Sequence, residues 1–217
     1  MTVRAKICGV DSAAAVAAAL AGGASHLGFV FYPPSPRALT PPKAAALAAP
    51  IAGAAQRVGL FVDPDDATVA AVLAAVPLDL LQLHGSESPA RLTALKARFG
   101  RPVMKAIKIG AATDVELAND YLETADWLLF DARPPAQMKG ALPGGNAVSF
   151  DWRWLAGRRW PLPWMLSGGL HAGNVGEAVR LSGAGMVDVS SGVEDVPGRK
   201  NPTKVTEFLR VVAALEA

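Results

Sequence analysis

The sequence predicts an α/β protein that folds as a single closed (β/α)₈ barrel, and three observations lead to this fold class. Short apolar runs alternate with longer amphipathic segments rich in alanine and leucine along the chain of 217 residues. Eight of these runs are almost continuously apolar, which is typical of parallel strands buried on both faces. No Gly-x-Gly-x-x-Gly motif follows the first run, which disfavours an open, doubly wound sheet.

The expected elements follow in a regular order, with each strand leading to one helix. We expect strands at residues 3–7, 26–31, 57–62, 78–83, 103–107, 127–130, 164–166 and 186–189. We expect helices at residues 12–21, 42–49, 65–75, 87–99, 114–121, 151–156, 172–181 and 202–214, several of them near cap-competent residues such as Ser12, Thr40 and Asp114. Residues 131–151 are rich in proline and glycine and are predicted to form a long loop of the active site. No linker interrupts the pattern, so residues 1–217 are predicted to form one domain.

The amino-acid composition limits the partners and the cellular location that we expect for the protein. Lysine and arginine total 21 against 19 acidic residues, so a nucleic-acid-binding surface is not expected. Asp11 and Ser12 interrupt the N-terminal apolar stretch, which is therefore too short for a membrane span or a signal peptide. Cys8 is the single cysteine, so no internal disulfide forms and a reducing, cytoplasmic location is expected. Monomer and homodimer both remain open.

Polar residues gather at the expected carboxyl ends of the strands, where barrels of this type place their active sites. They are Lys6, Cys8, Arg37, Asp63, Gln82, His84, Asp131, Ser167, Ser190 and Ser191. These residues are far apart in the sequence, but closure of the barrel would bring them to one rim. The predicted site therefore depends on the predicted closure of the barrel.

Cys8 and Asp131 are the candidate base and acid. Taken alone, a cysteine is more often a small buried hydrophobe, and an aspartate after a strand often caps a turn. A thiol has an ordinary pKa of about 8.5 and needs a neighbouring cation, such as Lys6, to act as a base. An aspartate opposite Cys8 on the rim would be placed to act as a general acid.

Two glycine-rich segments follow the last two expected strands and predict a small phosphorylated ligand. Backbone N–H groups at such turns bind anions, and barrels frequently bind phosphate at this pair of loops. The candidate phosphate ligands are Gly168, Gly169, Ser190, Ser191 and Gly192. Arg37 lies in a stiff proline-rich loop that suits it to a carboxylate, although a solvated arginine is the alternative. A structural histidine and a substrate contact are equally open for His84.

Taken in chain order, the motifs resemble the phosphoribosylanthranilate isomerase family of tryptophan biosynthesis. They are KICG at residues 6–9, GFVF at 28–31, SPR at 35–37, VGLFV at 58–62, LQLHG at 81–85, LFD at 129–131, FDW at 150–152, LSGGL at 166–170 and DVSSGVE at 188–194. Each is short, but their order along alternating strand ends is highly specific. The resemblance covers nearly the whole chain and implies a TIM barrel.

The resemblance implies an Amadori rearrangement of a phosphoribosyl anthranilate into its 1-deoxyribulose isomer. Asp131 would protonate the ring oxygen, and Cys8 would remove the C2 hydrogen. Arg37 would hold the anthranilate carboxylate, the two glycine loops would hold the phosphate, and Lys6 and His84 would make further contacts. No cofactor is implied, and the sequence has no metal-ligand spacing.

The sequence departs from the usual family pattern at a few residues, and other functions are alternatives to the isomerase. Asn146 and Ala147 stand in a loop where the family usually has a further glycine and a basic residue, and Asn201 stands where it usually has aspartate. The histidine-pathway isomerase is disfavoured because its base at the first strand is an aspartate. A non-catalytic phosphate-binding barrel would not need both Cys8 and Asp131, and a lyase such as the tryptophan synthase α subunit would rely on two carboxylates.

Overall fold

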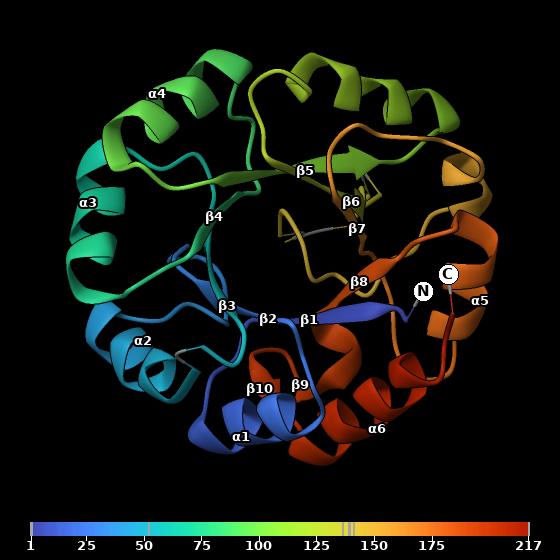
Figure 1. Ribbon diagram of the computed structural model, residues 1–217, viewed down its shortest axis with the longest axis horizontal. Coiled ribbons are helices and arrows are strands. Elements are labelled where there is room, and N and C mark those ends of the chain that lie inside the picture. Colours follow the sequence, from blue (N-terminus) through green and yellow to red (C-terminus); the bar gives the residue numbers. More distant parts are fainter. Residues whose placement is uncertain (1, 52, 136, 139, 141, 217) are drawn as a thin grey trace.

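Eight parallel strands close into a barrel in the order β1 to β8, and helices surround it (Figure 1). This computed structural model describes residues 2–51, 53–135, 137–138, 140 and 142–216. The strands are β1 (Arg4–Cys8), β2 (His26–Val30), β3 (Gln56–Phe61), β4 (Leu80–Leu83), β5 (Val103–Ile109), β6 (Trp127–Ala132), β7 (Trp164–Leu166) and β8 (Met186–Val189). The predicted (β/α)₈ fold class is confirmed, with strand ends shifted by up to two residues.

Four α-helices begin one to three residues later than expected, two of them because the first expected residue, Ser12 or Asp65, is the N-cap. The α-helices are α1 (Ala13–Ala21), α2 (Pro41–Ala48), α3 (Asp66–Ala75), α4 (Pro89–Phe99), α5 (Val175–Ser182) and α6 (Pro202–Ala213). Ser12 and Asp65 accept hydrogen bonds from the backbone N–H groups of Ala15 and Thr68, as N-caps do. Thr40 also precedes its helix, but its side chain makes no capping hydrogen bond.

Two expected helices are wrong in type, because both are 3₁₀ helices. They are η2 (Ala112–Tyr121) and η3 (Trp152–Leu155), and two shorter 3₁₀ turns are η1 (Ala49–Ile51) and η4 (Ser191–Val193). Asp114, expected as a cap, lies inside η2 and binds the backbone N–H groups of Gly110 and Ala111 with its carboxylate. Side chains that compete for backbone groups in this way weaken a regular α-helix.

Apolar packing fills the barrel below its polar rim. Side chains from six strands form one interior cluster of Val58, Leu80, Met104, Ala106, Leu129, Met165 and Met186. A larger cluster lies between the strands and the surrounding helices. Because strand side chains alternate between faces, Gln82 shares the inward face of β4 with Leu80, and His84 comes directly after the strand. Four tryptophans pack against the larger cluster: Trp152, Trp154, Trp160 and Trp164.

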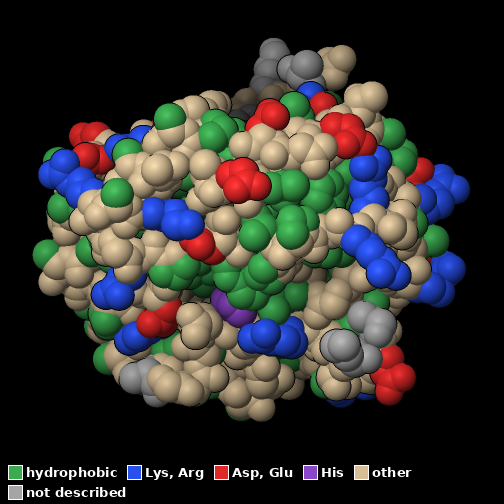
Figure 2. Space-filling model, turned by 45° about the horizontal axis from the view of Figure 1, so that its top comes forward, with side chains coloured by type: hydrophobic (Ala, Val, Ile, Leu, Met, Phe, Trp, Pro, Cys, Tyr) green, Lys and Arg blue, Asp and Glu red, His purple; other side chains and the backbone are tan. Residues whose placement is uncertain are grey.

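The end of the chain closes the barrel beside its beginning. The N–H group of Val3 donates to the carbonyl of Leu215 at 3.3 Å, and α6 packs against α1 and β1. A small antiparallel pair that the sequence did not predict, β9 (Glu194–Val196) and β10 (Arg199–Lys200), precedes α6. On the visible face, apolar side chains gather near the middle, with charged side chains of both signs around them (Figure 2). No helix within the described ranges is long and apolar enough to span a membrane.

Candidate active site

A pocket of about 730 Å³, counted to its open mouth, lies at the carboxyl ends of the strands. The expected site residues among its lining are Cys8, Arg37, His84, Asp131, Gly168, Gly169, Ser190 and Ser191. Two other expected residues, Lys6 and Gly192, are not part of that lining. The barrel therefore brings most of the distant polar residues to one cavity, as the sequence predicted.

Cys8 ends β1 and lies beside its register partner Gly28. A Cβ atom at residue 28 would come within 3.1 Å of the Cys8 Sγ and within 3.3 Å of the Lys6 Cε, so glycine preserves the room of both side chains. Burial raises the pKa of the Cys8 thiol, while the charges of Lys6 and Lys200 act in the opposite direction. Lys6 is thus the cation that a thiolate requires, but burial outweighs it and favours the thiol in the free protein.

Lys6 lies behind the pocket rather than on its wall. Its ammonium group is fully buried and pairs with the Asp188 carboxylate at 2.8 Å, because the two residues are register partners in β1 and β8. The other carboxylate oxygen of Asp188 accepts a hydrogen bond from Ser167 at 3.3 Å. Direct contact between Lys6 and substrate stays a prediction, because Lys6 is not among the residues that line the pocket. Asp188, which does line the pocket, had no role assigned from the sequence.

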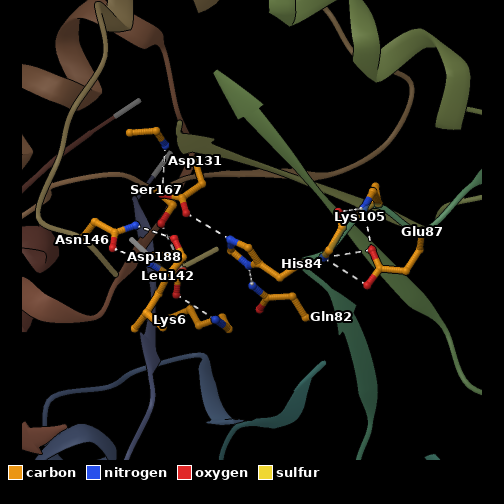
Figure 3. Close-up of polar contacts among 12 residues, drawn as sticks. Lys6, Gln82, His84, Glu87, Lys105, Asp131, Leu142, Asn146, Ser167 and Asp188 are labelled. Atoms are coloured by element: carbon orange, nitrogen blue, oxygen red, sulfur yellow. Dashed lines mark hydrogen bonds and ion pairs between the residues drawn. The ribbon is translucent and has the colours of Figure 1, made fainter. Parts of the chain in front are cut away.

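Asp131 faces a buried chain of polar side chains from β4 (Figure 3). The Nε2 of His84 lies 3.0 Å from the Asp131 Oδ2, and the Nδ1 of His84 lies 2.9 Å from the Gln82 Nε2. The Asp131 Oδ1 accepts a hydrogen bond from the backbone N–H of Ala132 at 3.0 Å. Both oxygens of the candidate acid are therefore engaged, one by the backbone and one by a histidine.

Arg37 is buried and already has a carboxylate partner. Its Nε and Nη2 atoms each donate to an oxygen of Glu194 at 2.8 Å, and Nη2 also donates to the Gly145 carbonyl at 3.2 Å. Lys200 binds the same Glu194 carboxylate. The solvated alternative for Arg37 is therefore wrong in this structure. Glu194 belongs to the DVSSGVE motif, but nothing in the sequence showed that it would face Arg37.

The glycine loops allow backbone segments to approach closely. Gly168 and Gly169 have φ values of +94° and +64°, which favour glycine. A Cβ atom on Gly192 would lie 1.9 Å from the Leu170 carbonyl oxygen, so this residue must be glycine for the two loops to meet. Within the described ranges, the backbone amides of Gly168 and Gly169 donate to no protein group. Free N–H groups in such a turn are suited to bind an anion.

Comparisons with known proteins agree with this geometry. A family model described as N-(5'phosphoribosyl)anthranilate (PRA) isomerase matches residues 5–211. The chain belongs to this family. It is an enzyme, an isomerase, as its relatives are named.

Relatives and solved structures of the family cover nearly the whole chain. The N-(5'-phosphoribosyl)anthranilate isomerase of Paramagnetospirillum magneticum is 56% identical over 211 residues, 97% of each chain. That of Rhodospirillum centenum is 55% identical over 215 residues, 99% of this chain and 100% of the relative. The structure from Thermotoga maritima has a TM-score of 0.86 at 33% identity, covering 98% of this chain and 100% of its own. Another, with a TM-score of 0.83 at 31% identity and the same coverage, is a complex with reduced 1-(o-carboxyphenylamino)-1-deoxyribulose 5-phosphate.

The chain's departures from the usual family pattern have local structural explanations. Asn146 accepts a hydrogen bond from the N–H of Leu142 at 3.0 Å and donates to its carbonyl at 2.7 Å, which closes the loop over the pocket. Ala147 has a φ of +57°, a conformation that glycine adopts more readily. Asn201 caps α6 by accepting hydrogen bonds from the N–H groups of Thr203 and Lys204. The departures alter the loop backbone and the cap, and they leave Cys8 and Asp131 in place.

Proposed function

We propose that Asp131 and Cys8 are the acid and base with which this isomerase rearranges N-(5'-phosphoribosyl)anthranilate to 1-(2-carboxyphenylamino)-1-deoxyribulose 5-phosphate in tryptophan biosynthesis. The observation that carries the proposal is the placement of both side chains in one pocket at the barrel rim. The family match favours this reaction over the histidine-pathway rearrangement, a lyase or a non-catalytic barrel. The relative solved with a reduced product supports a phosphorylated small molecule as ligand.

The reaction needs one proton donor and one proton acceptor on opposite sides of the sugar. Asp131 gives its proton to the ring oxygen, the C1–oxygen bond breaks, and the anthranilate nitrogen forms a Schiff base with C1. The cationic nitrogen then accepts the electron pair that remains when Cys8 removes the C2 proton. The resulting enolamine gains a proton at C1 and loses the hydroxyl proton at C2, which gives the ketone and restores the proton count.

The chain's free form holds these protons differently from the reactive form. Burial favours the Cys8 thiol, and the two oxygens of Asp131 face His84 Nε2 and the Ala132 N–H. Catalysis requires the thiolate and the carboxylic acid instead. Lys6 and Lys200 provide positive charge that favours the thiolate.

The remaining pocket residues suit the two anionic ends of the substrate. We assign the carboxylate to the Arg37 guanidinium, which Glu194 holds by one edge. The phosphate is assigned to the turns at Gly168, Gly169, Ser190, Ser191 and Gly192, with Gly192 setting the approach of the loops rather than lining the pocket. Among the described residues, no cluster of three or more metal-ligating side chains occurs. The proposed steps use only protein groups and the substrate's own nitrogen.

Substitution of the acid and the base tests the proposal. We expect Cys8→Ala and Asp131→Ala each to lower kcat by about 10²–10⁴-fold, because each removes one proton-transfer group. The fall in anthranilate fluorescence as substrate is consumed measures the rate, and titration with a reduced product analogue measures binding. Exposed Asp120 offers a matched control, since Asp120→Ala should retain full activity. Normal turnover in either site variant would disprove the role assigned to that residue.

Assembly and location remain predictions for this chain. We propose that it functions in the cytoplasm as a monomer or homodimer, without nucleic acid. One solved relative from Thermotoga maritima is described as monomers generated from a dimeric isomerase, at 31% identity and a TM-score of 0.83. Analytical ultracentrifugation across a concentration series distinguishes the two assembly states.

A further inference from the structure

The buried amide of Gln82 carries an inference that rests on the proposed role of Asp131. Gln82 lies on the inward face of β4, fully buried, and does not line the pocket. We infer that Gln82 and His84 form a hydrogen-bonded pair, called the adaptor, that has two states. In one state Asp131 can hold a proton, and in the other state Asp131 is kept ionised. Gln82 is thus a positioning residue, acting on the acid through His84.

In the first state, His84 is a donor to Asp131. The Gln82 amide nitrogen lies 2.9 Å from Nδ1 and donates to it, so the imidazole proton is on Nε2. Nε2–H then donates to the Asp131 Oδ2 at 3.0 Å, while the Ala132 N–H donates to Oδ1. Asp131 is a carboxylate here and cannot serve as an acid.

In the second state, the amide is inverted and the site holds one more proton. The Gln82 Oε1 then accepts a hydrogen bond from Nδ1–H, and the unprotonated Nε2 accepts one from the Asp131 carboxyl group. The carboxyl proton leaves its hydrogen bond to Nε2 as it is transferred to the substrate ring oxygen, and a carboxylate then faces the Nε2 lone pair. This contact is repulsive, so Asp131 recovers a proton readily when the C2 hydroxyl releases one during ketone formation.

The surroundings of Gln82 allow both orientations. Its Oε1 is buried and has no hydrogen-bond partner among the described residues. After inversion the amide nitrogen would occupy that unpartnered position, so each orientation leaves one amide atom unsatisfied. An unsatisfied buried polar atom is unfavourable in either orientation, and the two states are therefore close in hydrogen-bond energy. A partner for Oε1 would have locked the amide and the histidine tautomer.

The charged side chains around His84 and Asp131 are paired with one another. His84 is therefore the side chain that exchanges a hydrogen bond with Asp131. On one side Lys6 pairs with Asp188 at 2.8 Å, and on the other Lys105 pairs with Glu87 at 2.6 Å. The second pair also fixes the residue after His84, because Glu87 accepts from the Gly85 N–H and Lys105 donates to the Gly85 carbonyl. The imidazole is therefore held in place while its protons change.

Asp131→Asn provides a direct test without turnover. The Ala132 N–H requires an acceptor, so the asparagine oxygen stays on that side and its amide nitrogen is directed at His84. This imitates the protonated acid. We expect long-range ¹H–¹⁵N NMR spectra to show His84 protonated on Nε2 in the wild type and on Nδ1 in Asp131→Asn. The chain has three histidines, and His84→Asn identifies the signals. An unchanged Nε2 tautomer in Asp131→Asn would overturn the inference.

Kinetics of two Gln82 variants separate the adaptor from a merely structural role. Gln82→Glu retains an acceptor for Nδ1–H, whereas Gln82→Met retains the volume and loses both hydrogen-bonding atoms. We expect Gln82→Met to lower kcat at least about tenfold with KM unchanged, and Gln82→Glu to retain more kcat than Gln82→Met. A packing role gives the opposite order, because a buried charge disturbs the core more than methionine does. Gln56→Met, an exposed site at the start of β3, is the matched control.

These outcomes distinguish failure of the inference from failure of the proposed function. If the wild type does not turn over the expected substrate but the His84 tautomer still follows residue 131, the proposed function fails, while the coupling between residue 131 and the His84 tautomer stands. If turnover depends on Cys8 and Asp131 while both Gln82 variants behave like the wild type, the adaptor fails and the proposed function stands.

Discussion

Arg37 owes its position to Glu194, which binds one edge of the guanidinium through two hydrogen bonds. Glu194 is in turn held by Lys200 and by the N–H of Gly198. The positive charges lower the pKa of Glu194, even though burial by itself would raise it. A bidentate pair of this kind fixes the plane of the guanidinium, so its remaining donors have a defined direction.

Removal of Arg37 should therefore weaken binding more than catalysis. We expect Arg37→Ala to cost about 2–5 kcal/mol in binding of the reduced product analogue, with a smaller effect on kcat. Glu194→Gln keeps the shape but loosens the guanidinium, and should raise KM less than Arg37→Ala does. Fluorescence titration and steady-state kinetics measure both quantities. Unchanged KM in Arg37→Ala would exclude a carboxylate contact at this residue.

Helix α6 packs against α1 and β1, and its first turn depends on one side chain. The Oδ1 of Asn201 accepts hydrogen bonds from the N–H groups of Thr203 and Lys204, at 2.8 and 3.2 Å. Its amide nitrogen donates to both oxygens of Asp195 at 3.0 Å. An aspartate could make the first set of bonds but would meet Asp195 with a like charge. The asparagine therefore joins the cap to the β9–β10 pair.

Loss of this cap should be measurable as a loss of stability. We expect Asn201→Ala to lower the free energy of unfolding by about 1 kcal/mol, because the first turn of α6 loses its acceptor. Thr40→Ala is the matched control, since Thr40 precedes α2 without a side-chain capping bond and should cost much less. Urea denaturation followed by circular dichroism compares the two. Equal losses in both variants would contradict the capping role.

The stability of the whole molecule depends on a histidine in the lower part of the barrel that resists protonation. Burial, followed by the charges of Lys6 and Arg4, lowers the pKa of His26 to about 3. Its Nδ1 lies 2.9 Å from the Ser25 hydroxyl, and its ring packs edge-on against Trp127. In the unfolded chain the same imidazole takes up a proton near pH 6.5. Between these two values the unfolded state binds more protons, so stability falls as pH falls.

His26 should therefore contribute to acid unfolding of the barrel. Complete protonation is expected to cost about 3–5 kcal/mol, beginning below pH 6.5 and ending near pH 3. We expect His26→Asn to show a flatter dependence of unfolding free energy on pH across this window than the wild type. Exposed His171 is the control, and His171→Asn should leave the wild-type slope unchanged. Parallel slopes in wild type and His26→Asn would refute the assignment.

The alternation of apolar strands and amphipathic helices was sufficient to predict the barrel and its active rim. Strand periodicity is a local property, and it directs Cys8 and Asp131 to the rim without knowledge of their neighbours. The 3₁₀ form of η2 was missed because it depends on how Asp114 competes for nearby backbone groups. Sequence therefore determined the element order more reliably than the type of each helix.

Partners across the barrel were decided only by the tertiary structure. Arg37 and Glu194, or His84 and Asp131, are far apart in the chain, and barrel closure and strand register bring each pair together. The direction of the Cys8 pKa likewise follows from burial against Lys6, which depends on the depth of β1 in the barrel. By itself, the sequence determined the fold, the family and the position of most candidate residues at the rim. Which rim groups share protons and charges was decided by distances that exist only after the barrel closes.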